Sequence, residues 1–370
     1  MNSLERVRAA MRFQRPDRVP VWKAGLGDVL PLPMFPPASW QPGHRPEENG
    51  LFPYVGDDLY VRWRLWRWRR PGWARAPRFR DYLTLPREEI DEWGGIWKRE
   101  GRDLSLGHPG RGRLADWKDL DAHLDRYNPD PDDISRYRIP LLYNRWVGRR
   151  RYRMAILFWQ GPFTIASILR GFENFMTDHV LHPAELKRLL AFITGKYAAG
   201  MRAWRKFGAD PHGFVLYDDL ADQTRPFLRL PMFREFYEPV YRALADEAHA
   251  LGCDLHLHTC GKIDALIPTL MEWGIDALEL DSPRMTGYEA LAPFRGRIMM
   301  WGCVDIQTIY PCGAPEEVEA EVERMVNGLG TPEGGYGAYF YPQRRHIGLP
   351  QENEKAFQRG LKKYGTYLKK

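Results

Sequence analysis

The segment Cys253-Asp-Leu-His-Leu-His-Thr-Cys-Gly-Lys262 has the residue types and the spacing best suited to bind a metal ion. Its first residues are typical of a short β-strand, and Gly261 is expected to end that strand in a turn. Side chains two residues apart share one face of a strand, so His258 and Cys260 should project together. An imidazole and a thiolate in this arrangement form half of a zinc site, whereas a buried cysteine beside a hydrogen-bonded core histidine is the alternative.

The elements that must position these side chains alternate between apolar, strand-like runs and helical stretches from residue 150 onward. Several of the helical stretches have Pro near the start or Gly just after the end, as helices often do. With one further strand that the pattern does not reveal, the alternation predicts an α/β fold with parallel strands, a single-domain (β/α)₈ barrel spanning residues 1–370. The expected strands are residues 19–22, 154–158, 213–217, 254–258, 277–280, 298–301 and 337–341, and the expected helices are residues 183–203, 231–251, 263–273 and 315–329.

Residues 30–150 interrupt this alternation and are rich in Pro, Trp, Arg and Gly. We interpret them as an irregular excursion that covers one end of the barrel. Within it, residues 62–80 carry eight Arg and four Trp. Such a segment could bind RNA or single-stranded DNA, could hold a small molecule with several carboxylates, or could be an Arg-rich surface without a ligand.

Polar residues follow the expected strands one after another. Because the active site of such a barrel lies at the C-terminal ends of its strands, these side chains should surround one cavity. We expect Asp218, Asp219 and Asp305 to be catalytic residues, as acid, base or substrate-binding groups, although Asp after a strand is also a common turn former or helix cap. The residues that follow strands are Asp218, Asp219, His258, Cys260, Asp281, Cys303, Asp305 and His346.

A zinc site needs more than the two ligands His258 and Cys260. We expect His346 to be the third, since a loop after the last strand can fold over the barrel mouth. Cys303 is the alternative third ligand, and Cys312 is expected to be a bystander. His256 shares a strand face with His258 but should lie deeper, in the core.

Composition limits the remaining functions. The chain has 370 residues and is 44% hydrophobic, so it can bury a large core. It has no run of 18 apolar residues, its first residues lack the apolar segment of an export signal, and its four Cys suggest reduced thiols. We therefore expect a cytoplasmic protein without a membrane segment. The net charge of +6 is a mild excess for this length, so nucleic acid is not an expected partner on charge alone.

Taken in order, the motifs resemble those of the uroporphyrinogen decarboxylase superfamily over nearly the whole chain. That superfamily also contains methylcobalamin:coenzyme M methyltransferases and corrinoid-linked O-demethylase methyltransferases. The matching segments are Glu5-Arg-Val with Pro16-Asp-Arg-Val-Pro-Val21, Asp91-Glu-Trp-Gly-Gly-Ile-Trp97, Gly161-Pro-Phe163, Leu169-Arg-Gly171, Tyr217-Asp-Asp-Leu220, His258-Thr-Cys-Gly261, Gly302-Cys-Val-Asp305 and His346-Ile-Gly-Leu-Pro-Gln-Glu-Asn353.

The resemblance implies a (β/α)₈ barrel and favours the methyltransferase branch. True decarboxylases carry an Arg-rich loop just after the opening Pro-Val strand, whereas this chain has Lys23 there and no Arg pair. The methyltransferases bind zinc through His-x-Cys and a distant Cys. Here His258 and Cys260 match the first two ligands, while the region of the distant Cys contains no Cys and has His346 as its candidate ligand. The implied cofactors are Zn²⁺ and a corrinoid carried by a partner protein, with a small-molecule methyl donor or acceptor.

Three functions remain open. The first is the corrinoid-dependent methyltransferase, for which Asp58, Glu279 and Tyr341 are the expected substrate-binding residues. The second is a decarboxylase of a multi-carboxylate substrate, in which Asp58 or Asp219 stabilises a cationic intermediate. The third is a non-catalytic barrel that binds a ligand or RNA through residues 62–80. A homodimer is a further association that the sequence permits.

Overall fold

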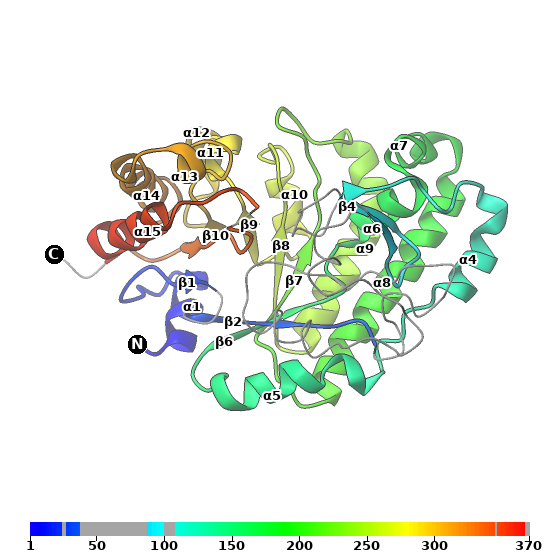
Figure 1. The fold of residues 1–370 in the computed structure, drawn as a ribbon, viewed down its shortest axis with the longest axis horizontal. Coiled ribbons are helices and arrows are strands. Elements are labelled where there is room, and N and C mark those ends of the chain that lie inside the picture. Colours follow the sequence, from blue (N-terminus) through cyan, green and yellow to red (C-terminus); the bar gives the residue numbers. More distant parts are fainter. Residues whose placement is uncertain (24–26, 38–86, 100–107, 345, 367–370) are drawn as a thin grey trace.

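The computed structural model describes residues 1–23, 27–37, 87–99, 108–344 and 346–366. Eight parallel strands form one sheet in the order β1-β11-β10-β9-β8-β7-β6-β2, and helices surround it (Figure 1). β1 and β2, at the two ends of this order, touch each other, so the sheet forms a nearly closed barrel. The strands are β1 (Val21–Trp22), β2 (Val29–Pro33), β6 (Tyr152–Ile156), β7 (Gly213–Tyr217), β8 (Asp254–His258), β9 (Ala277–Leu280), β10 (Met299–Gly302) and β11 (Tyr336–Tyr339).

The (β/α)₈ barrel and all seven expected strands are confirmed. The eighth strand, β2, reads Val-Leu-Pro-Leu-Pro, and its two prolines hide it among the turn-like residues that follow. A central strand donates N–H groups to neighbouring strands on both of its sides, and proline has no N–H to donate. β2 pairs with β6 only and faces the seam of the barrel on its other side, where Pro31 and Pro33 leave no ladder bond unmade. Residues 30–33 therefore belong to the barrel and not to the excursion.

The expected helices are present outside the sheet, with small differences in their ends. The helix expected over residues 263–273 begins later, as α10. In the described chain, no helix combines the length and the apolar character that a membrane crossing requires. The barrel helices are α6 (Pro162–Arg170), α7 (Phe172–Leu181), α8 (Pro183–Lys206), α9 (Leu230–Ala250), α10 (Ile267–Glu272), α11 (Pro283–Thr286), α12 (Tyr288–Leu291), η3 (Ala292–Phe294), α13 (Ile309–Cys312), α14 (Pro315–Leu329) and α15 (Gln351–Tyr364).

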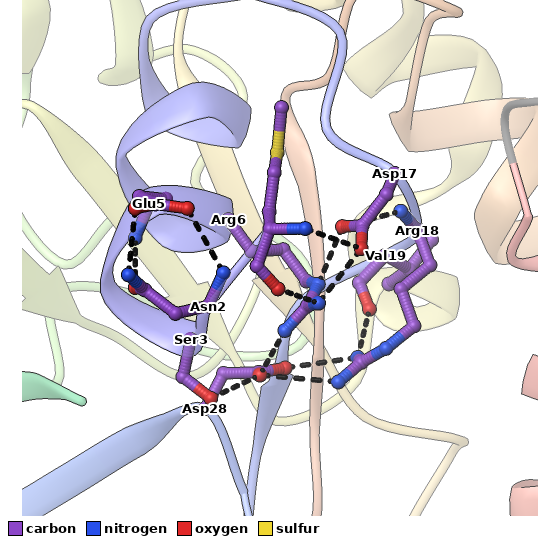
Figure 2. A network of polar contacts seen from close by, with 9 residues as sticks. Asn2, Ser3, Glu5, Arg6, Asp17, Arg18, Val19 and Asp28 are labelled. Atoms are coloured by element: carbon purple, nitrogen blue, oxygen red, sulfur yellow. Dashed lines mark hydrogen bonds and ion pairs between the residues drawn. The ribbon is translucent and has the colours of Figure 1, made fainter. Parts of the chain in front are cut away.

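Helix α1 (Ser3–Met11) lies at the N-terminal end of the barrel. The Leu4 N–H donates to the carbonyl of Arg150, just before β6, at 2.8 Å. The Gly335 N–H, just before β11, donates to the carbonyl of Ala10 at 2.9 Å. Figure 2 shows that α1 also brings Arg6 against two carboxylates near the strand starts, and this ion network ties the helix to the barrel.

The small sheet in the described part of the excursion lies against the opposite end of the barrel, whereas helix α5 packs along strand β2. This antiparallel sheet places Trp97 on Ile168 of α6, where the two side chains form a buried contact. The Asp91 carboxylate holds this sheet by accepting from Trp97 Nε1 at 2.7 Å and from the Gly95 N–H at 2.7 Å. Asp58 and residues 62–80 lie outside the described residues. The elements of this region are β3 (Arg87–Ile90), β4 (Ile96–Arg99), β5 (His108–Pro109), η1 (Trp117–Asp119), α4 (Leu120–Arg126), η2 (Ile134–Arg136) and α5 (Arg138–Val147).

Candidate active site at the barrel mouth

His258 is the last residue of β8, and its imidazole is held by a neighbouring strand. Its Nδ1 hydrogen-bonds to Oε2 of Glu279, the residue directly opposite on β9. A carboxylate partner requires an N–H at Nδ1, which leaves the lone pair of Nε2 free to accept. That Nε2 lies 3.5 Å from Cys260 Sγ and 3.7 Å from Asp219 Oδ1. Carboxylate-bound histidines of this kind are the usual ligands of catalytic metals.

The distances from His258 Nε2 to the other two atoms are close to those in a tetrahedral zinc site. With Zn–N, Zn–O and Zn–S bonds of about 2.0–2.3 Å, neighbouring ligand atoms lie roughly 3.3–3.6 Å apart. The ligand atoms of Asp219, His258 and Cys260 all lie within 4.8 Å of one another. Three protein ligands would leave the fourth position of the ion open, as in catalytic zinc sites.

Buried carboxylates surround these ligands without enough positive charge to match them. Glu279 Oε1 and Asp281 Oδ1 are buried and have no hydrogen-bond partner among the described residues. Burial raises the pKa of Glu279 to about 7 and also raises the pKa of Asp281. Burial and the Asp219 carboxylate raise the pKa of the Cys260 thiol. Burial alone would lower the pKa of His258, but Glu279, Cys260 and Asp281 together outweigh it and raise that pKa. A bound cation would relieve this excess of negative groups.

A cavity of about 320 Å³ opens beside the cluster at the C-terminal ends of the strands. Its walls come from the barrel, from the small sheet of the excursion and from the loop after β11. The lining residues are Trp97, His108, Pro109, Trp159, Gln160, Thr164, Ile168, Tyr217, Asp219, His258, Asp281, Tyr339, Tyr341, Pro342, Gln343 and His346.

Asp219 and Tyr341 therefore lie at the cavity, whereas Asp218 is turned away from it. The buried Asp218 carboxylate accepts from the N–H groups of Phe163 at 3.2 Å and Thr164 at 2.8 Å, at the start of α6. It also accepts from Tyr241 Oη at 2.7 Å. Burial raises the pKa of Asp218 to about 6. Its position is that of a helix cap.

Asp305 occupies a second cap position. Its carboxylate accepts from Ser282 Oγ at 2.9 Å and from the Thr308 N–H at 3.1 Å, ahead of the short helix α13. Although burial acts to raise it, the Thr308 and Ser282 hydroxyls hold the pKa of Asp305 below its usual range. The structure places neither Asp305 nor Asp218 among the cavity-lining residues.

The sequence suggested His346 or Cys303 as the third metal ligand, but the side chain that lies beside His258 and Cys260 is Asp219. The described residues contain two groups of converging ligand atoms, one from Asp219, His258 and Cys260 and one from His258, Glu279 and Asp281. His346 lines the cavity, but its nitrogens belong to neither group. Cys303 is buried outside both groups, and burial raises the pKa of its thiol. Cys312 is exposed on α13. His256 lies in the core as expected, with Nε2 2.9 Å from Tyr152 Oη.

Two tryptophans of the cavity carried no assigned role in the sequence. Trp159 follows β6, and both Phe158 and Trp159 have left-handed backbones, with φ of 48° and 64°. The next turn needs Gly161, since a Cβ there would lie 2.2 Å from Asp218 Cγ. Trp97 reaches the cavity from β4. Both tryptophans stand in or beside motifs that could have marked them.

The fold and the site define a (β/α)₈ barrel with a polar, partly unsatisfied cluster at its C-terminal mouth. The chain belongs to the uroporphyrinogen decarboxylase family, whose model matches residues 150–338 under the description "Uroporphyrinogen decarboxylase (URO-D)". A comparison of the sequence with curated proteins finds no match.

Among solved structures, the chain is similar to a methyltransferase from Methanosarcina mazei. The TM-score is 0.58 at 16% identity, over 98% of this chain and 99% of that chain. A glycosylated endo-beta-1,4-xylanase from Gloeophyllum trabeum aligns with a TM-score of 0.41 at 8% identity, over 62% of this chain and 80% of that one. A chitinase from Chromobacterium violaceum aligns with a TM-score of 0.35 at 10% identity, over 84% and 98%. The first likeness supports the barrel fold.

Proposed function

We propose that the protein is a methyltransferase that moves a methyl group between a small molecule and a corrinoid carried by a partner protein. The reaction would take place at a Zn²⁺ ion held by Asp219, His258 and Cys260. The observation that carries the proposal is the convergence of His258 Nε2, Cys260 Sγ and Asp219 Oδ1 at distances suited to tetrahedral zinc. Membership of the family is compatible with it.

Each residue of the cluster has a physical part in this proposal. Glu279 holds the imidazole of His258 through Nδ1 and so aims Nε2 at the ligand position. The Cys260 N–H donates to Asp219 Oδ1 at 3.2 Å, which keeps the two ligands side by side. Asp281 Oδ2 lies 3.7 Å from Cys260 Sγ and accepts a hydrogen bond from the thiol. Zinc, when bound, supplies a Lewis acid that stabilises a thiolate or polarises the atom bearing the methyl group.

The charges near the cavity favour this proposal over decarboxylation of a multi-carboxylate substrate. Gripping several carboxylates requires several cations, preferably Arg. The described lining residues include neither Arg nor Lys. Lys23, which stands where an Arg pair would be expected, forms an ion pair with Glu354, and Glu354 also pairs with Arg344 at 2.8 Å.

Zinc content tests the metal site. We expect about one Zn²⁺ per chain in the wild type and in Cys312→Ser, whose thiol is exposed and remote from the cluster. Cys260→Ser and His258→Gln should lose the metal. Asp219→Asn and His346→Gln, compared with each other, separate the two candidates for the third ligand. The proposal would be overturned if wild-type protein supplied with excess zinc bound none, or if Cys260→Ser bound as much zinc as the wild type.

Turnover tests the reaction. The zinc-loaded protein should demethylate methylcobalamin when a thiol or a tertiary amine is offered as acceptor, and Cys260→Ser should not. The loss is followed by the absorbance of the corrinoid. In a parallel incubation, uroporphyrinogen should keep its carboxyl groups. Robust loss of carboxyl groups there would favour the decarboxylase instead.

A further inference from the structure

Five aromatic side chains, two Trp and three Tyr, line the cavity. Five rings reach it from four parts of the fold, namely β4, the turn after β6, the end of β7 and the end of β11. The face of such a ring carries partial negative charge and attracts cations, most strongly quaternary ammonium groups that have little water to lose. The five side chains are Trp97, Trp159, Tyr217, Tyr339 and Tyr341.

Besides the His258 imidazole, the titratable groups that the described residues bring closest to the metal ligands at the cavity are carboxylates. Among the described lining residues, the carboxylates are Asp219 and Asp281, and Arg and Lys are absent. If Zn²⁺ is bound, the Cys260 thiolate and the Asp219 carboxylate balance its two charges. Asp281 is then left with one oxygen that has no partner in the described chain. A small cation would meet a counter-charge here, whereas an anionic ligand would be repelled.

Trp159 is held at the wall at some energetic expense. Left-handed backbone is strained at a non-glycine residue, and Phe158 and Trp159 both adopt it. In addition, the Trp159 Nε1–H is buried and finds no acceptor in the part of the chain that the structure describes. Strain of this kind persists where the surrounding structure requires a side chain in one place, which here is the wall of the cavity.

From these three observations we infer that the small molecule taken by this cavity is a quaternary ammonium compound. This inference rests on the proposed function, because it names the class of methylated substrate on which that function would act. The methylated nitrogen would lie between the aromatic faces, and Asp281 would supply the counter-charge. A cavity of about 320 Å³ suits a small molecule of this class.

The test compares choline with its neutral analogue, in which a carbon atom replaces the nitrogen. Both have the same shape, so their difference in affinity reports the charge. Calorimetric titration of the zinc-loaded full chain should show choline binding at least about tenfold more tightly than the analogue. Equal affinity for the two compounds, or no binding of choline, would overturn the inference.

Substitutions then locate the binding site. Asp281→Asn and Trp159→Leu should each weaken choline binding about tenfold, with little change for the neutral analogue. Trp159→Phe keeps a ring face and should retain most of the affinity, which guards against an effect of misfolding. The matched controls are Asp246→Asn and Trp146→Leu, whose side chains are exposed on α9 and α5. Equal losses in the controls would contradict the assignment.

The two proposals can fail separately. Choline titration needs no corrinoid, and zinc content needs no substrate. If the protein binds zinc and turns over methylcobalamin but does not prefer choline to its analogue, the ammonium inference fails and the proposed function stands. Preferential choline binding by a protein that holds no zinc would remove the zinc-dependent reaction and leave the ligand class.

Discussion

Asp28 and Asp281 are both buried carboxylates next to barrel strands, but they differ in how many partners satisfy their charge. Asp28 precedes β2 at the N-terminal end and is 2% exposed. Its oxygens accept from Arg6 Nη1 at 2.6 Å and Arg18 Nη1 at 2.9 Å (Figure 2). They also accept from the Val21 N–H at 2.9 Å. Asp281 follows β9 at the mouth, where one oxygen lies 3.7 Å from the Cys260 thiol and the other has no partner within the described ranges.

The difference separates residues that stabilise the fold from residues that await a ligand. A buried charge is tolerated when a nearby opposite charge and hydrogen bonds satisfy it. At the N-terminal end, Arg6 and Arg18 meet that condition for Asp28. At the mouth, the described residues leave Asp281 short of a partner, as expected where a cation from outside the chain completes the site.

The largest expected effect on stability comes from disrupting the ion network around Asp28 at the N-terminal end. Asp28→Asn keeps the shape of the side chain but removes the charge that faces Arg6 and Arg18. Removing one partner of a buried ion pair typically costs about 3–5 kcal/mol, because the opposite charge remains buried without compensation. We expect a loss of this size in the free energy of unfolding, measured with urea.

The matched control for this loss is an exposed pair. Lys187 Nζ lies 2.7 Å from Glu235 Oε1, and both side chains are about half exposed. Exposed pairs contribute little, so Lys187→Ala should lower stability by less than about 1 kcal/mol. If Asp28→Asn costs no more than this control, the N-terminal network is not the stabilising end that the comparison requires.

A smaller effect is expected from acid at the same end. The hydrogen bond from Arg6 lowers the pKa of Asp17 from 3.8 to about 2. A carboxylate with a lowered folded-state pKa adds stability above its unfolded pKa and loses it as the pH falls through the folded value. Asp17 should therefore contribute about 2 kcal/mol above pH 4, lost as the pH falls to about 2.

Urea unfolding of the wild type and Asp17→Asn between pH 5 and pH 2 measures this contribution. The variant should be less stable at pH 5 and should approach the wild type at pH 2. A difference that stays constant over this range would show that Asp17 acts through packing and not through its charge.

The sequence predicts the fold well because most strands obey simple rules. Buried parallel strands read as short apolar runs between helices, and this pattern reveals seven of the eight. β2 escapes it because Pro31 and Pro33 look like turn residues. Only the pairing of β2 with β6, a contact between distant segments, shows that these prolines stand at a seam.

The site is predicted less completely, for a related reason. His258 and Cys260 share a strand face, so their meeting follows from local geometry. Asp218 and Asp219 are adjacent, and the sequence cannot say which one turns toward the cavity. The start of α6 decides it, since its free N–H groups take up Asp218 and leave Asp219 at the mouth. The prediction that His346 is the third zinc ligand likewise depends on how the loop after β11 folds, which the spacing of residues in the sequence does not determine.

The smallest expected effect sharpens the comparison at the mouth. Asp281→Asn makes the same chemical change as Asp28→Asn, but at a position where burial and the nearby Asp219 carboxylate disfavour the charge. Removing a charge that the folded state disfavours should not cost stability. In metal-free protein, kept so with a chelator, we expect urea unfolding at pH 8 to show no loss, or a gain of up to about 1 kcal/mol. A loss above roughly 2 kcal/mol would mean that Asp281 is already satisfied in the free protein. The two ends of the barrel would then be alike, and the case for an external cation at the mouth would lose its main support.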